Sequence, residues 1–166
     1  MRPRARIAAA LVAAALALAS NSAPAADQAV GQSVVVAQSV EETHTVDPTM
    51  VEQLPAVEEK LSFLTSHGPE QATYTGALLW SVLDRSGMLG GGRRARLRHT
   101  IVVTGRDGYA ASLALAEIDP DFEGKQVLLA YRRNGQPIEG KTLRLVVPGD
   151  HHGGRSVRDV VRIDLH

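Results

Sequence analysis

The sequence predicts an α+β domain dominated by β-structure, in which about eight short strands form a mixed sheet and two or three short helices accompany it. Strand-length apolar runs recur along the 166 residues. They are separated by the turn signals Asp107-Gly108, Asn134-Gly135 and Pro148-Gly149, which are typical of hairpins and tight turns. Residues 76–86 have the best helical spacing of apolar side chains.

The amino-terminal half predicts three strands and one helix start. Strands are predicted at residues 33–37, 41–46 and 57–64. Asp47-Pro48 indicates a helix start, because Asp caps free backbone N–H groups and Pro suits the first helical position. Alternation along the third strand predicts that Val57, Leu61 and Phe63 face inward. Residues 66–75 are expected to form a polar loop.

The second half begins with the helix predicted at residues 76–86. Its apolar stripe consists of Leu79, Val82 and Leu83, and Gly87 is expected to cap its carboxyl end. A turn is expected at 119–121, and strands are predicted at 97–104, 109–115, 127–131, 143–147 and 157–163.

The first 25 residues have the pattern of a secretory signal peptide. Arg2, Arg4 and Arg6 precede an apolar stretch at 7–19, and Ala23-Pro24-Ala25 offers small residues for cleavage. The apolar stretch is short for an uncleaved membrane anchor, which is the alternative. We therefore expect a signal peptide at 1–25, a flexible tail at 26–32 and one domain at 33–166. We expect the protein to be periplasmic or secreted, with no membrane span after cleavage.

Charge and composition exclude several classes of protein. Removing residues 1–25 removes three arginines and no acid, which leaves 15 basic and 18 acidic residues and a net charge of −3. A net acidic chain with 4% aromatic residues does not suit nucleic acid, which is bound by basic faces with stacking rings. The chain has no cysteine, which excludes disulfides and thiolate catalysis.

The clearest candidate site is the segment Gly153–Ser156 together with Arg158. Glycines let a backbone approach an anion closely, and guanidinium and hydroxyl groups donate hydrogen bonds to its oxygens. The alternative is a surface turn whose arginines pair with Asp150 and Asp159. We expect a small anionic ligand to be bound by Arg144, Gly154, Arg155, Ser156 and Arg158.

Other polar residues are weaker candidates. His67 is a candidate acid–base group, or an unpartnered loop histidine. Tyr109 is a candidate hydrogen-bond donor at the mouth of a pocket, or a cross-strand aromatic. His151 and His152, with His67 or His99, are candidate ligands for Zn or Cu. Adjacent histidines of an extended segment face opposite ways, so both rarely bind one metal. No metal site is therefore predicted.

A basic run lies at residues 93–98. If the run is extended, Arg94, Arg96 and Arg98 share one face and steer anions or dock an acidic partner. The alternative is a solvated edge that blocks unwanted strand pairing. Trp80 is expected to pack in the core.

Segments of the chain, in the same order, resemble the sulfite-oxidase-type molybdopterin-binding domain. Between Val127 and Arg158, VLLAYRRNGQP, LRLVVPG and GRSVR are similar to the family's LLAY-x-x-NG-x-P, LR-x-VVPG and G-x-RSVK. YTGALLWSVLDRSG and VVTGRDGYAASLALAEI resemble its central helix and the hairpin that follows. LSFLTSHG stands where the family has its thiol-bearing strand. The resemblance runs from about Val34 onward and implies the molybdopterin-binding oxidoreductase fold.

The resemblance also implies a molybdopterin pocket, with Arg155 and Ser156 at matching positions and Arg158 in place of the family's Lys. Two departures stand against it. No cysteine occupies Leu64–His67, where the family's molybdenum ligand stands, and Glu139-Gly140-Lys141 stands where the family tends to have a His. Sulfite-type oxygen-atom transfer is therefore not expected. The signal also lacks a twin-arginine pair, which argues against a cofactor loaded before export.

Three functions remain open. The first is an exported molybdopterin-dependent-oxidoreductase-like domain that binds a pterin-type or other anionic ligand, with molybdopterin implied by resemblance only. The second is a cofactor-free binding module of the cell envelope, whose partner is an envelope protein or a small oxyanion. The third is a periplasmic protein that binds metal through histidines. If the chain is an enzyme, we expect a molybdopterin-dependent oxidoreductase.

Overall fold

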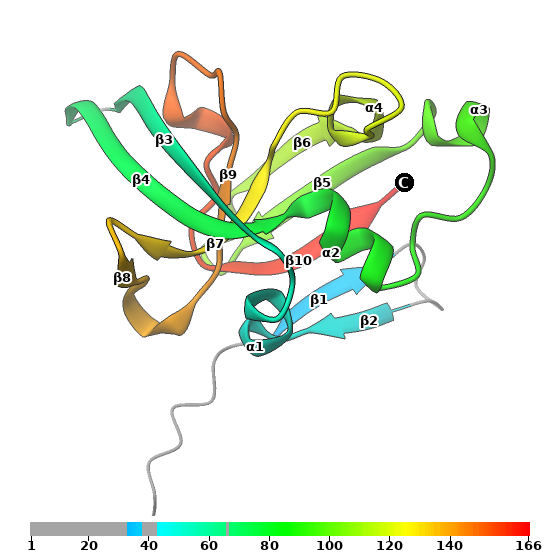
Figure 1. Cartoon of the computed structure of the whole chain (residues 1–166), viewed down its shortest axis with the longest axis horizontal. Helices are drawn as coiled ribbons and strands as arrows, with labels where there is room; N and C mark the ends of the chain where they lie inside the picture. The colour runs from blue at the N-terminus through cyan, green and yellow to red at the C-terminus, as the bar shows by residue number, and fades with distance from the viewer. Residues whose placement is uncertain (1–32, 38–42, 66) are drawn as a thin grey trace, which may run out of the picture.

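Two β-sheets make up most of the computed structural model, which describes residues 33–37, 43–65 and 67–166 (Figure 1). The first sheet has the strand order β2-β1-β10-β5-β6. Its strands are β1 (Val34–Ala37), β2 (Thr43–Val46), β5 (Thr100–Gly105), β6 (Ala110–Ala114) and β10 (Val160–Leu165). The sheet is mixed, because β1 runs parallel to β10 and the other neighbours pair antiparallel.

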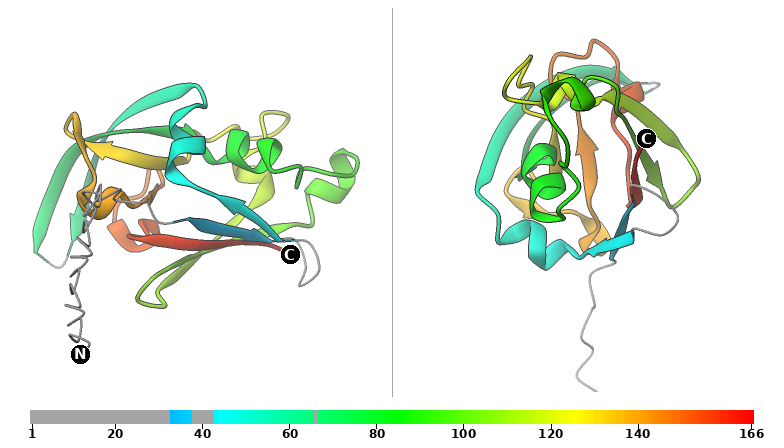
Figure 2. Two further views of the ribbon diagram at one scale, coloured as in Figure 1. Left: turned by 90° about the horizontal axis from the view of Figure 1, so that it is seen from below. Right: turned by 90° about the vertical axis from the view of Figure 1, so that its right-hand side faces the viewer.

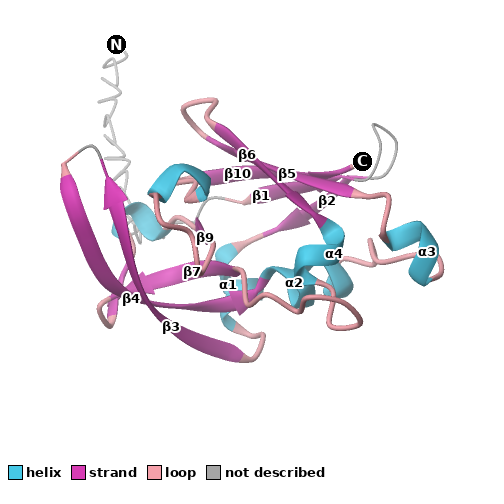
Figure 3. Cartoon of the chain, turned by 90° about the horizontal axis from the view of Figure 1, so that it is seen from above, coloured by secondary structure: helices cyan, strands magenta, loops and turns pink. Residues whose placement is uncertain are grey.

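The second sheet is antiparallel and carries a long hairpin. Its path is β3-β4-β7-β8, and β9 also pairs with β7. Its strands are β3 (Ala56–Thr65), β4 (Gly68–Leu78), β7 (Leu128–Arg133), β8 (Gln136–Pro137) and β9 (Arg144–Val146). Figure 3 shows the two sheets on opposite sides of the molecule. The β3–β4 hairpin and α3 extend at opposite ends (Figure 2).

Short helices connect the strands. They are α1 (Pro48–Glu52), α2 (Leu79–Arg85), α3 (Arg93–Arg96), α4 (Leu115–Ile118) and the 3₁₀ turns η1 (Glu139–Lys141) and η2 (Gly153–Arg155). This β-rich α+β architecture confirms the predicted fold class. No helix in the described part of the chain is long and apolar enough to cross a membrane. The predicted signal peptide and tail lie outside the described residues.

Apolar side chains from both sheets form the main core. Val36, Ile101 and Ile163 of the first sheet and Leu129 and Leu145 of the second are fully buried in one cluster. A smaller cluster lies on the other face of the second sheet, where β3 and β4 curl over β7 and β9. It contains Leu61, Phe63, Ala72, Tyr74, Leu128, Ala130 and Val146. The site described below lies beside this smaller cluster.

Local signals in the sequence predicted several elements well. The Asp47 carboxylate accepts a hydrogen bond from the Met50 N–H at 2.8 Å and caps α1. Asn134 and Gly135 both have positive φ, 51° and 77°, as the tight β7–β8 turn requires. Gly87 has a φ of 75° just after α2, which is the left-handed geometry of a helix end.

Two expectations were wrong. Residues 66–75 do not form a polar loop, because β4 begins at Gly68 and pairs with β3 along its length. Alternation of Ala72 and Tyr74 with exposed or half-buried neighbours marks this strand, and the strand delays the start of α2 to Leu79. Residues 93–98 are not extended. The N–H of Arg96 donates to Gly92 in a helical turn, and its side chain binds the buried Asp119.

Close backbone contacts lock the strands around the site. A Cβ at Gly105 would lie 2.5 Å from the carbonyl oxygen of Arg158, so only glycine lets these segments approach. The N–H of Leu145 donates to Val157 at 2.8 Å, and that of Val160 donates to Leu143 at 2.9 Å. These two bonds connect the second sheet to the segment that enters β10. The segment carrying Arg158 is thereby held between the sheets.

Candidate anion-binding site

Arg144 is the central cation of the site. It lies on β9, and its side chain is only 11% exposed. Its Nε donates to Ser156 Oγ at 2.9 Å, and that hydroxyl donates to the Leu145 carbonyl at 3.1 Å. The guanidinium carbon lies 5.2 Å from the centre of the Tyr74 ring, where the ring face attracts a cation. The guanidinium is therefore held in one orientation by an aromatic ring and a hydroxyl.

In the described structure Arg144 makes no hydrogen bond to a carboxylate, and its ion pair with Glu70 is long. Its NH1 lies 3.9 Å from Glu70 Oε1, which is beyond hydrogen-bonding distance. That oxygen already accepts hydrogen bonds from Arg133 at 3.0 Å and from Tyr74 at 3.1 Å. Burial lowers the pKa of Arg144, whereas Tyr74 and Glu70 act in the opposite direction. The terminal nitrogens of Arg144 thus remain available to an anion.

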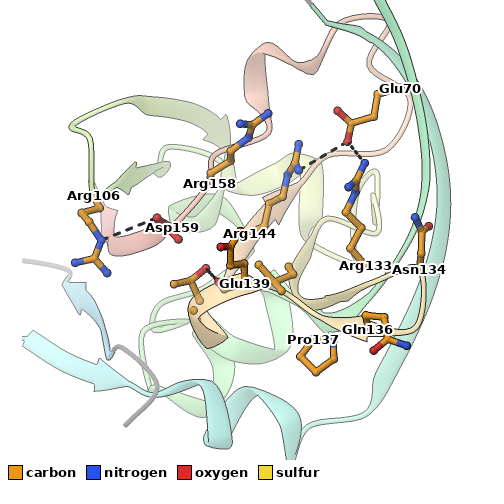
Figure 4. Close-up of a pocket in the computed structure, with 13 residues that line it drawn as sticks. Glu70, Arg106, Arg133, Asn134, Gln136, Pro137, Glu139, Arg144, Arg158 and Asp159 are labelled. Carbon is orange, nitrogen blue, oxygen red and sulfur yellow. Dashed lines mark hydrogen bonds and ion pairs between the residues drawn. The ribbon is translucent and has the colours of Figure 1, made fainter. Parts of the chain in front are cut away.

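Two cavities meet at Arg144 and Arg158. The smaller has a volume of about 480 Å³ and is lined by Phe63, Leu64, Thr65, Arg144, His152, Gly153, Gly154, Ser156 and Arg158. The larger has a volume of about 870 Å³ and extends over β8 and η1 (Figure 4). The lining of the smaller cavity contains two guanidinium groups and no carboxylate. An anion is the charge that this cavity favours.

Arg158 is the exposed cation of the pair. In the part of the chain that the structure describes, its side chain makes no hydrogen bond or ion pair within 4.0 Å. Its backbone is positioned by Gly105, as described above, and by Asp159, which follows it with a φ of 46°. The Asp159 carbonyl accepts a hydrogen bond from the Arg106 N–H at 2.9 Å. The backbone that carries Arg158 is thus firmly anchored, while its guanidinium is free.

The η2 turn closes one side of the smaller cavity and packs on β3. A Cβ at Gly153 would lie 2.9 Å from the Phe63 ring, so this turn sits directly on the ring. The Leu64 N–H donates to the His151 carbonyl at 3.0 Å, which attaches the segment to the end of β3. From the other side, the Tyr109 hydroxyl donates to the carbonyl of Gly154. The turn is therefore clamped between two hairpins.

The structure brings together four of the five predicted anion-binding residues. Arg144, Gly154, Ser156 and Arg158 line the smaller cavity. Arg155 does not line either cavity. Its guanidinium donates to Asp150 at 2.6 and 2.9 Å and to Glu117 at 3.0 Å. Hydrogen bonds to Asp150 and then to Glu117 raise the pKa of Arg155 despite some burial, and its role here is to tie η2 to α4.

Of the weaker candidates, only His152 lines a cavity. His67 is exposed, and its backbone N–H donates to Thr65 Oγ1 at 3.1 Å. Tyr109 is half exposed and holds the η2 turn rather than lining the cavity. His152 lines the smaller cavity, whereas His151 does not. Within the described ranges, no three His, Asp or Glu side chains gather to hold a metal ion.

Sequence reasoning missed the support of Arg144 by β4. Tyr74 and Glu70 lie within residues 66–75, which were expected to form a loop. Tyr74 is fully buried, and burial raises the pKa of its hydroxyl. The alternation of Ala72 and Tyr74 with polar residues was the available signal. Arg133 stands two residues after the predicted strand VLLAY, and the pairing of β7 with β4 brings it to Glu70.

Comparison with known proteins identifies the family and supports the fold. The family described as "Oxidoreductase molybdopterin binding domain" matches residues 29–166. The chain belongs to this family. A comparison with curated proteins finds no match. Among solved structures, the sulfane dehydrogenase SoxCD from Paracoccus pantotrophus is similar, with a TM-score of 0.64 and 18% sequence identity. The match covers 81% of this chain and 38% of that chain, so it supports the fold alone.

The donor set fits only part of a molybdopterin. Guanidinium groups, the Ser156 hydroxyl and the glycines of η2 suit an anionic, phosphate-bearing group. The end of β3 offers no thiolate to a molybdenum ion. Leu64 is apolar, and the Thr65 hydroxyl donates to the Gly68 carbonyl at 2.8 Å. A hydroxyl engaged in this way is not the soft ligand that such a metal prefers, so the residues present do not fit the metal.

Proposed function

We propose that this chain is an exported domain of the molybdopterin-binding oxidoreductase family that binds a pterin-type or other anionic ligand at Arg144, Ser156 and Arg158. One observation carries the proposal. Arg144 is a largely buried guanidinium with an opposing hydroxyl and ring, but with no carboxylate in hydrogen-bonding contact. A buried charge is costly unless it is paired. A bound anion supplies a closer, hydrogen-bonded partner than Glu70 does.

The neighbouring groups favour an oxyanion. Arg158 adds a second cation that no carboxylate neutralises in the described structure. Guanidinium groups bind the oxygens of phosphate and carboxylate with paired hydrogen bonds. The backbone of Gly154 lies on the same wall, where a Cβ would meet nothing within 4 Å. The ligand can therefore approach the main chain closely.

We further propose that the domain does not carry out sulfite-type oxygen-atom transfer. The chain contains no cysteine. The signal pattern at residues 1–25 supports export to the periplasm or beyond. The alternative is a cofactor-free binding module of the cell envelope, which keeps the fold but binds no pterin.

The first experiment measures what the protein binds. The full chain is purified from the periplasm of its native host, and its molybdenum, zinc and copper contents are measured together with pterin fluorescence after oxidation. Pterin without stoichiometric molybdenum supports a pterin-type ligand. Neither pterin nor metal supports the cofactor-free module. Stoichiometric molybdenum contradicts the proposal, and one zinc or copper per chain supports the histidine-based alternative.

The second experiment tests the residues. Binding of inorganic phosphate and sulfate is measured by calorimetry for the wild type and for R158Q. We expect R158Q to weaken binding about tenfold, from the typical value of a hydrogen bond to a charged group, and we expect affinity to fall as salt is added. R132Q is the matched control, because Arg132 is exposed on β7 and lines neither cavity. Equal losses in the two variants would contradict the assignment.

A further inference from the structure

The larger cavity differs from the smaller one in its charge pattern. Its lining contains the guanidinium groups of Arg106, Arg133, Arg144 and Arg158 together with the carboxylates of Glu70, Glu139 and Asp159. The smaller cavity contains only two of these cations and no carboxylate. Arg144 and Arg158 belong to both. A ligand held by these two arginines therefore faces negative charge on one side only.

The three carboxylates are engaged to different degrees. Glu70 is the most engaged, because its Oε1 accepts hydrogen bonds from Arg133 and Tyr74 and lies 3.9 Å from Arg144 NH1. Asp159 lies 4.0 Å from Arg106, and both side chains are about half exposed, so this pair is weak. The Glu139 carboxylate makes no hydrogen bond or ion pair in the described part of the chain, and only its backbone carbonyl accepts one, from Thr142. Glu139 and Asp159 are thus the acidic groups that remain available.

The fold keeps these carboxylates out of contact with Arg144 and Arg158. Glu139 lies on η1, which is anchored between β8 and β9 and contains Gly140 and Lys141 with φ of 70° and 52°. No ion pair within 4.0 Å joins Glu139 to Arg144 or Arg158. Glu139 and Asp159 line the same cavity as the two arginines. In Figure 4 Asp159 lies beside Arg106, Glu139 lies near Arg144, and the dashed line from Arg144 runs to Glu70. Opposite charges that share a cavity without neutralising one another match a ligand that also carries both charges.

We propose that the ligand of this site is zwitterionic, with its anionic group on Arg144 and Arg158 and an amine against Glu139 and Asp159 in the larger cavity. This inference rests on the proposed function, because it takes the anion site as given. The volume of about 870 Å³ accommodates a small organic molecule. An ammonium group has three donors for the two carboxylates. A ligand with a second anionic group in this cavity is disfavoured by the same carboxylates.

Matched ligand pairs test the proposal on the full chain. Binding of 2-aminoethyl phosphate is compared with ethyl phosphate, and 4-aminobutyl phosphate with butyl phosphate, by calorimetry at low ionic strength. Each pair differs only in the amine, and the two lengths cover different positions of the carboxylates. We expect at least one amine to bind about threefold to fivefold more tightly than its partner, as for a partly exposed ion pair.

Variants assign the effect to residues. E139Q is expected to remove most of the preference for the amine by weakening the amine-bearing ligand, whereas R158Q weakens both members of a pair. D84N is the control, because Asp84 is an exposed carboxylate on α2 outside both cavities. If ethyl and butyl phosphate bind but neither amine binds more tightly, or if E139Q keeps the preference, the inference fails and the anion site stands. If no phosphate binds, the proposed function itself fails.

Discussion

Replacing Gly153 by alanine tests whether the wall of the smaller cavity depends on the close packing of η2 against the Phe63 ring. A Cβ at Gly153 would lie 2.9 Å from two carbons of the Phe63 ring, whereas a Cβ at the adjacent Gly154 would meet nothing within 4 Å. Ordinary carbon–carbon contacts lie at about 3.5–4.0 Å. The turn or the ring must therefore move by roughly 0.6–1 Å. The buried position of Phe63 limits how far the ring can yield.

Two opposing effects determine how much G153A lowers the free energy of unfolding. Overpacking costs about 1–3 kcal/mol, and the loss of glycine's freedom in the unfolded chain returns about 0.4–1 kcal/mol. We expect the free energy of unfolding of G153A to fall by about 1–2 kcal/mol, and that of G154A to stay level or rise by up to about 1 kcal/mol. Phosphate affinity is also expected to fall in G153A, because the same turn carries Gly154 and Ser156.

Urea denaturation of both variants measures the difference, since extrapolation to zero denaturant gives the free energy of unfolding. A double variant with F63L provides an internal check. Leucine removes the ring atoms that the new methyl group meets, so G153A should cost less in the F63L background than alone. Equal stabilities of G153A and G154A, or strictly additive losses in the double variant, would refute the reasoning.

Two further predictions concern the ion pairs that support this scaffold. Burial of Glu117 raises the pKa of its carboxyl group. Hydrogen bonds from the Ala114 N–H and the Arg155 guanidinium outweigh burial and lower this pKa below its ordinary 4.5. Its stabilising contribution is therefore present above pH 4.5 and is lost as the pH falls through the lower folded-state value. E117Q should flatten the fall of the urea midpoint below pH 4.5, and an unchanged slope would count against this role. Asp119 is 1% exposed and lies 2.6 Å from the 17% exposed Arg96, so D119A should lower the free energy of unfolding by about 3 kcal/mol. A loss under about 1 kcal/mol in the same urea assay would mean that solvent screens the pair.

Most elements of the fold were predictable because their signals are local. Asp47-Pro48, Asn134-Gly135 and Gly87 specify a helix cap, a tight turn and a helix end through their own backbone preferences. The strand at residues 68–78 was not recognised, because its Gly, Pro and polar residues indicate a loop when read alone. Pairing with β3 on one side and β7 on the other makes this segment a strand. The helical turn around Arg96 was not recognised for the same reason, since Asp119, which binds Arg96, is far away in the sequence.

The candidate site shows the same division. Ser156 and Arg158 were expected from a glycine turn beside basic residues, and the structure places both on one cavity wall. Arg155 has the same local context, yet its guanidinium is directed to Asp150 and Glu117. The pair of Arg155 with Asp150 was the expected alternative for this segment. The contact with Glu117 was not expected, and it arises because α4 lies next to the turn.

The amino-acid sequence alone determined the class of the fold, the order of its hairpins and the absence of any thiol that binds a metal, because turn chemistry, alternation and composition are properties of neighbouring residues or of the chain as a whole. Only the tertiary structure decided which cations are available. Tyr74 and Ser156 hold Arg144 in a buried position where the Glu70 carboxylate lies 3.9 Å away, while Asp150 and Glu117 bind Arg155 through hydrogen bonds. Charge balance at a cavity depends on residues that are separated in sequence and meet only when the sheets pack.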